Sequence, residues 1–103
     1  MIHRFVKMYF SESSEMDFVQ VFEQSVGKIM EFQGCHQVIL LKNMNDSNSM
    51  MTYSIWETDE DLQNYRNSEF FKNTWKKTKS LFEKKAEAWS MKDYKANLNS
   101  NIG

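Results

Sequence analysis

The stretch "WETDEDLQNYRNSEFFKNTW", residues 56–75, contains two helix starts in close succession. Four acidic residues follow its first tryptophan within five positions, and Thr58 stands just before three of them. Threonine is a frequent helix N-cap and carboxylates stabilise the first turn, so the pattern predicts a short helix over 59–66. Ser68 is a second N-cap, which predicts a longer helix over about 69–85. Two consecutive helices are therefore expected here.

Strand patterns surround this helical region. Runs rich in β-branched and aromatic residues predict four strands, at 2–10, 35–42, 50–57 and 86–94. Between the first two, a helical repeat of apolar residues begins near Ser14 and ends before Gly34. The order β-α-β-β-α-β, with the second crossover helix split, predicts an α+β, ferredoxin-like fold on an antiparallel sheet. We expect one domain over 1–94 and a flexible tail over 95–103.

Composition limits the classes of function. The chain has 103 residues and a formal net charge of −1, which gives one domain and no general attraction to nucleic acid or an anionic membrane. We expect neither as a partner. One cysteine, Cys35, leaves no intrachain disulfide and fits a reducing cytoplasm. The sequence has no zinc-ligand spacing and no phosphate-binding glycine loop, so no metal and no cofactor are expected.

The second and third predicted strands carry large apolar residues on both faces. Val38 and Leu40 alternate with Ile39 and Leu41 along one of them. Two helical crossovers cover only one face of such a sheet, and the other would expose more apolar surface than a monomer tolerates. We therefore expect a homodimer that packs sheet against sheet.

Three segments carry a resemblance to a known family: "FQGC" (32–35), "SIWETDEDLQNYRNSEFFKNTW" (54–75) and "AEAWS" (86–90). In this order they resemble the antibiotic biosynthesis monooxygenase (ABM) domains of the dimeric α/β-barrel superfamily. The resemblance implies a homodimer, with a pocket between sheet and helices in each subunit. It also implies oxygenation of quinol-like or polyketide aromatics without metal, flavin or haem.

Such chemistry makes defined demands on side chains. Triplet oxygen reacts slowly with closed-shell molecules, but an ionised quinol can pass it one electron. The protein must supply a dry pocket, a proton acceptor and donors for the developing oxyanion. Tyr65 and Arg66, near the bend between the two helices, are the candidate donors. His3 is the candidate base, if its face of the first strand looks at the helices.

Four aromatic side chains are candidates for substrate binding: Tyr53, Trp56, Phe71 and Trp75. Structural alternatives stand beside these roles. Trp56 and Trp75 are equally suited to the core. Arg66 is suited to a surface ion pair with a neighbouring acidic residue, and His3 to solvent at the end of the sheet.

Two other functions remain open at this stage. A non-catalytic protein that binds a small ligand can use the same scaffold. Haem degradation is disfavoured, because the haem-degrading branch of the resembled family has a tryptophan in place of Tyr65 and a haem-ligating histidine in place of Trp75. A tryptophan side chain cannot ligate iron.

Overall fold

The computed structural model describes residues 1–95. It contains four strands and three helices in the order β1 (Ile2–Phe10), α1 (Glu12–Met30), β2 (Cys35–Lys42), β3 (Ser49–Trp56), α2 (Asp59–Arg66), α3 (Glu69–Lys79) and β4 (Phe82–Lys92). The strands form one antiparallel sheet in the order β2-β3-β1-β4. This confirms the predicted α+β, ferredoxin-like fold with its split second crossover. Apart from residue 95, the predicted tail lies outside the described residues.

The expected caps form at both helices of the stretch 56–75. The Thr58 side chain accepts a hydrogen bond from the Asp61 amide at 3.1 Å, and Ser68 accepts one from the Phe71 amide, also at 3.1 Å. Helix α1 differs from the prediction, because its N-cap is Ser11 and not Ser14. The carbonyl of Ser11 accepts the amide of Ser14 at 3.0 Å, so the helix begins immediately after β1.

The boundary between α3 and β4 also differs from the prediction. Helix α3 ends at Lys79 and not near residue 85, and the strand begins at Phe82. Phe82 pairs with Phe10 across the sheet, and their ring centroids lie 5.6 Å apart. Because Phe10 is fully buried, packing against it favours the strand over the helical propensity of "LFEKK". Phe82 therefore packs on the apolar face of α3 from the sheet instead of extending the helix.

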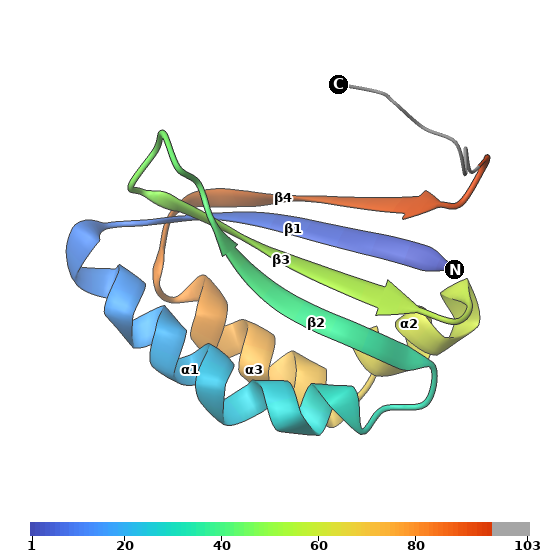
Figure 1. Ribbon diagram of the computed structural model, residues 1–103. Coiled ribbons are helices and arrows are strands. Elements are labelled where there is room, and N and C mark those ends of the chain that lie inside the picture. The colour runs from blue at the N-terminus through green and yellow to red at the C-terminus, as the bar shows by residue number, and fades with distance from the viewer. Residues whose placement is uncertain (96–103) are drawn as a thin grey trace.

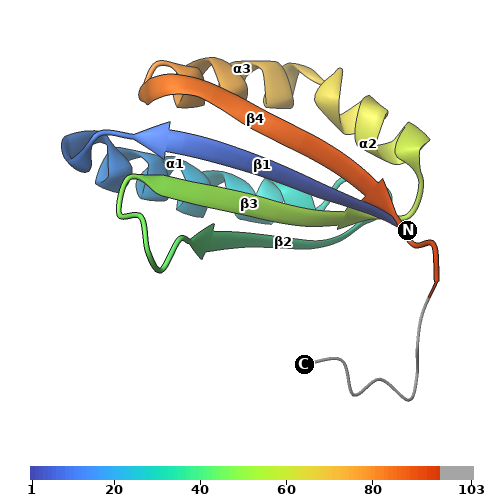
Figure 2. The ribbon, with the colours of Figure 1, turned by 90° about the horizontal axis from the view of Figure 1, so that it is seen from above.

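All three helices lie on one side of the sheet (Figure 1). On β1, the side chains of Val6, Met8 and Phe10 face the helices and contribute to the core. Seen from above, the strands lie in front of α1 and their other face has no helix over it (Figure 2). We call this second face the outer face.

The outer face is rich in apolar side chains, as expected from the sequence. Strand pairing places the following large side chains on it: Phe5, Ile39, Leu41, Met51, Tyr53, Ile55, Trp89 and Met91. Leu41 is 42% exposed and Met91 is 55% exposed. The two-sided apolarity of the strands is therefore present in the structure, and one side of it is uncovered in the single chain.

Gly34 adopts the left-handed conformation predicted for it, with a φ of 81°. A Cβ atom at this position would lie 2.2 Å from a carboxylate oxygen of Asp61, and the Gly34 carbonyl accepts the Glu57 amide at 2.7 Å. The turn after α1 therefore lies directly against the start of α2.

Within the described residues, none of the helices has the length and apolarity to span a membrane.

Candidate functional site

A cavity of about 380 Å³ lies between the helix-facing side of the sheet and the three helices. Every helix and every strand contributes to its wall. The volume falls in the range of pockets that hold small organic ligands. The fold therefore provides the pocket between sheet and helices that the family resemblance implies.

The aromatic part of the wall comes from β3, α2 and α3. Trp56 stacks on Tyr65 with ring centroids 4.9 Å apart, Tyr65 meets Phe71 edge to face at 5.1 Å, and Phe71 stacks on Trp75 at 5.9 Å. All four line the cavity. Trp56 is also fully buried, so it serves the core and the cavity wall at once.

Tyr65 has a packed ring and a hydroxyl group that has no partner in the described part of the chain. Its ring also contacts Phe32 at 5.0 Å, while no hydrogen bond to the hydroxyl is found within residues 1–95. Burial raises the pKa of Tyr65 far above its ordinary value, and the nearby Cys35 raises it further. The phenol is therefore neutral at physiological pH. It can donate a hydrogen bond, but it cannot act as a base.

Two arginines line the same cavity. Arg66, at the end of α2, is exposed and donates to the Gln63 side chain at 3.3 Å. Arg4, on β1, is half-buried and donates to the Ser90 hydroxyl at 2.9 Å. Neither arginine forms an ion pair with a carboxylate in the described part of the chain. The alternative of a surface ion pair for Arg66 is therefore not observed.

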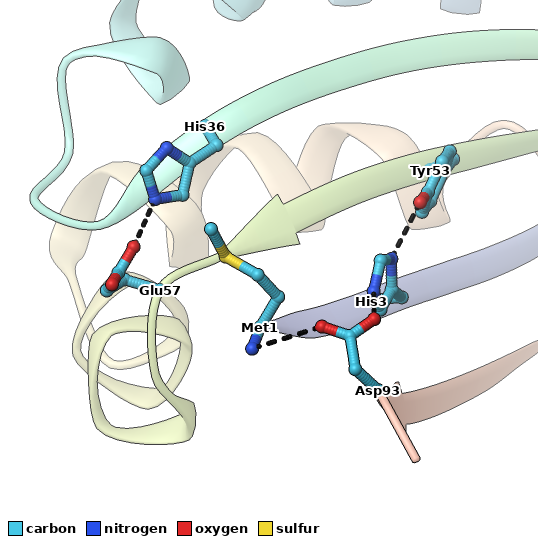
Figure 3. A network of polar contacts seen from close by, with 6 residues as sticks. All are labelled: Met1, His3, His36, Tyr53, Glu57 and Asp93. Atoms are coloured by element: carbon cyan, nitrogen blue, oxygen red, sulfur yellow. Dashed lines mark hydrogen bonds and ion pairs between the residues drawn. The ribbon is translucent and has the colours of Figure 1, made fainter. Parts of the chain in front are cut away.

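The structure does not bring His3 and Tyr53 into this cavity. Both lie on the outer face, where His3 Nδ1 and the Tyr53 hydroxyl are 2.7 Å apart (Figure 3). Position 3 alternates with the buried positions of β1, so its side chain must point away from the helices. The condition under which His3 would serve as base, that its face looks at the helices, is not met.

His3 instead belongs to a chain of polar contacts on the outer face. Its Nε2 lies 2.7 Å from Asp93, and Asp93 lies 3.4 Å from the amino group of Met1, as Figure 3 shows. The hydrogen bond from His3 lowers the pKa of Asp93 below its ordinary value, and the amino group of Met1 adds to this shift. The network ties the end of β4 to the start of β1.

Cys35 and His36 are not among the residues that line the cavity. The thiol of Cys35 lies near Met30 and the Gln37 carbonyl, and burial raises its pKa, which makes it a poor nucleophile. His36 pairs with Glu57 at the surface (Figure 3). Neither has the surroundings of a catalytic group.

Sequence reasoning did not assign Arg4, Ser54, Thr52 or Thr74 to the site, although all four line it. For Arg4 a signal was present. A charged residue shares one side of β1 with Val6 and other apolar positions, and such a residue is expected to have a specific partner. For the short polar residues, no sequence pattern separates cavity lining from ordinary packing.

The ionisable groups of the cavity wall are limited in kind. Among the described residues that line it there is no carboxylate and no imidazole, and its polar side chains are arginines, hydroxyls and one phenol. Within residues 1–95 no group of three histidine, cysteine or acidic side chains is placed to hold a metal ion. The arginines and the phenol of the wall are groups that can donate hydrogen bonds.

Comparison with known proteins agrees with this architecture. The family model described as "Antibiotic biosynthesis monooxygenase" matches residues 1–77. No curated protein matches the chain.

Several solved structures share the fold. A conserved protein from Methanosarcina mazei Go1 superposes with a TM-score of 0.86 at 13% identity, covering 90% of this chain and 92% of that one. Rv0793 from Mycobacterium tuberculosis gives 0.84 at 8% identity, with 92% and 96% covered. A structure described as an antibiotic biosynthesis monooxygenase gives 0.83 at 12% identity, with 92% and 100% covered. These likenesses show the fold, and the family model spans most of the sequence. The chain belongs to the antibiotic biosynthesis monooxygenase family.

Proposed function

We propose that the protein is a cofactor-independent monooxygenase that oxygenates a quinol-like aromatic molecule in the cavity between sheet and helices. One observation carries this proposal. The cavity is lined by an aromatic wall, by Tyr65, whose hydroxyl has no hydrogen-bond partner within residues 1–95, and by Arg66. An aromatic wall suits a flat substrate, and the two donors suit an oxyanion.

The reaction needs no external reductant. A hydroquinone and O₂ can give a hydroxyquinone and water, with one oxygen atom entering the ring and the other leaving as water. The electrons that reduce the second oxygen atom come from the oxidation of the hydroquinone itself. The ionised substrate passes an electron to oxygen, and negative charge then develops on the oxygen atoms. Donors placed beforehand at this charge lower the barrier.

The roles of the residues follow from their positions. Tyr65 stays protonated and donates a hydrogen bond to the developing oxyanion, and Arg66 adds positive charge at the same cavity. Trp56, Phe71 and Trp75 hold the aromatic body of the substrate. His3 and Tyr53 have no place in this step, because they lie on the other face of the sheet.

Oxygen uptake with a panel of naphthohydroquinones tests the proposal. A matched pair of variants locates the reaction. Thr74→Phe places a ring in the cavity, whereas Asn73→Phe places one at the exposed neighbouring position. We expect the wild type and Asn73→Phe to consume oxygen faster than the buffer control, and Thr74→Phe to consume it no faster than that control. Ligand-induced stabilisation without any uptake would favour the non-catalytic binding protein instead.

We also propose that the reaction takes place in the cytoplasm, where a single unpaired cysteine is stable. The active form that we propose is a homodimer in which the outer faces of the two subunits pack together. Exposed apolar side chains such as Leu41 and Trp89 on the outer face support this pairing. Sedimentation at micromolar concentration should show a dimer for the wild type and for Lys76→Glu, which alters an exposed residue of α3. Trp89→Glu should give a monomer. A monomeric wild type would contradict the pairing.

A further inference from the structure

A row of polar residues crosses the helix-facing side of the sheet at one end of the cavity. Strand pairing sets Arg4 opposite Ser54 on β3 and opposite Ser90 on β4. The next row on the same side contains Thr52, Val6 and Ala88, so it adds one hydroxyl and no charge, and Met8 follows in the core. One end of the cavity floor is therefore polar and cationic, and the rest is largely apolar.

The donors of this row are oriented by neighbours and have capacity left. The Trp56 indole donates to the Ser54 oxygen at 3.0 Å, and within residues 1–95 the Ser54 hydroxyl donates to no other group, so its hydrogen can be donated to a ligand. Arg4 gives one N–H to Ser90 and has five in all. Arg66 lines the cavity from the helix side, so the polar end is bounded by guanidinium groups from both layers.

We propose that Arg4, Ser54 and Arg66 form a binding site for a planar oxyanion, so that the protein selects aromatic substrates that arrive already ionised. The anion is an acidic ring hydroxyl or a ring carboxylate, two groups with the same flat, delocalised charge. The identification of the ligand as a substrate rests on the proposed function. The binding site itself rests on the arrangement of the side chains.

Charge supports the assignment. Two guanidinium groups on one cavity repel each other, and neither is paired with a carboxylate in the described part of the chain. Burial lowers the pKa of Arg4, the charge of Arg66 lowers it further, and Asp59 opposes the shift. A bound anion would offset both effects. Bidentate contact with a flat oxyanion is the geometry that arginine favours.

The lack of a base in the wall points to the same class of ligand. No lining residue can remove a proton at neutral pH, because the described lining includes no carboxylate and no imidazole and burial keeps Tyr65 protonated. A substrate that must become an anion to react with oxygen therefore has to ionise by itself. The arginines favour that ionised form through its charge.

Anaerobic titration calorimetry at pH 7 tests the site with three probes of the same bicyclic body. 2-Naphthoate carries a carboxylate, 2,4-dinitro-1-naphthol carries an ionised hydroxyl, and 2-naphthol is neutral. We expect at least one of the two anions to bind about tenfold more tightly than 2-naphthol, the effect of one charged hydrogen bond. Arg66→Gln and Arg4→Gln should each abolish this preference, because each weakens the binding of the anions more than the binding of 2-naphthol.

Lys76→Gln removes the same charge from an exposed position on α3 and should have no effect on the preference. Arg4→Lys keeps a positive charge at the half-buried site, and it is the variant to titrate if Arg4→Gln does not fold. Equal binding of all three probes, or a preference that survives Arg66→Gln, would overturn the proposal. A preference for anions without oxygen uptake would contradict the proposed oxygenase activity and support the anion-binding site. Oxygen uptake without a preference for anions would support the oxygenase activity and contradict the anion-binding site.

Discussion

Tyr65→Phe separates catalysis from stability at a single oxygen atom. The Tyr65 ring is held by Trp56 at 4.9 Å and by Phe32 at 5.0 Å, and phenylalanine keeps both contacts. The hydroxyl has no hydrogen-bond partner within residues 1–95. Removing it therefore leaves no group unsatisfied, and we expect the free energy of unfolding to change by less than about 0.5 kcal/mol.

The effect on turnover should be large. If the hydroxyl donates to the developing oxyanion, its loss removes one preorganised donor from the site. Removal of such a donor costs about 2.7–4 kcal/mol of transition-state stabilisation, which corresponds to roughly 10²–10³ in kcat. The pKa of Tyr65 is raised far above neutrality, so the wild-type rate should show no step from ionisation of this phenol between about pH 6 and 9.

Steady-state oxygen uptake and urea unfolding measured on the same samples make the test. Tyr94→Phe is the matched control, because it removes a phenol that is 95% exposed, and it should change neither quantity. A Tyr65→Phe protein with full turnover would refute the role of the hydroxyl. A Tyr65→Phe protein that unfolds markedly more easily would show a structural role for it.

Three further predictions concern stability. Trp56→Ala should lower the free energy of unfolding in urea by about 3–5 kcal/mol, because Trp56 is fully buried. Trp75→Ala should lower it less, because Trp75 is half-buried, and equal losses of stability would contradict this difference in burial. Gly34→Ala should cost about 1–2 kcal/mol for the left-handed backbone, and the clash with Asp61 adds to it; an unchanged urea midpoint would be inconsistent with this geometry. Asp93→Asn should remove a pH-dependent contribution to stability, because the pKa of Asp93 is lowered in the folded protein. The wild type should be more stable than the variant above pH 3.8, the ordinary pKa, and should lose this advantage as the pH falls through the lowered pKa. A stability difference that persists at low pH would contradict this prediction.

The fold was predictable because its signals are local. The caps at Thr58 and Ser68 form as expected, and the positive φ of Gly34 requires glycine. The end of α3 was not predictable, because it depends on Phe82 packing against Phe10. That contact joins residues far apart in the sequence, and it outweighs the helical propensity of the glutamate and two lysines that directly follow Phe82.

The site was predictable only in part, for a related reason. Tyr65 and Arg66 line the cavity as their position near the bend suggested, although their catalytic roles remain predictions. The condition on His3 could not be resolved from the sequence, because alternation gives two faces without saying which one the helices cover. The apolar content of Val6 and Met8 identifies the helix-facing side, and the same criterion would have brought Arg4 into the site.

Oxygen-isotope labelling shows whether the protein inserts an atom of O₂ into a substrate held in the cavity. The metal-free, flavin-free protein is supplied with a naphthohydroquinone and ¹⁸O₂, and the hydroxyquinone product is weighed by mass spectrometry. We predict one labelled oxygen atom per product molecule for the wild type, at a rate above the buffer control, and no enzymatic product for Thr74→Phe, in which the cavity is filled. Unlabelled product, or labelled product formed equally fast by Thr74→Phe, would contradict oxygenation in this cavity.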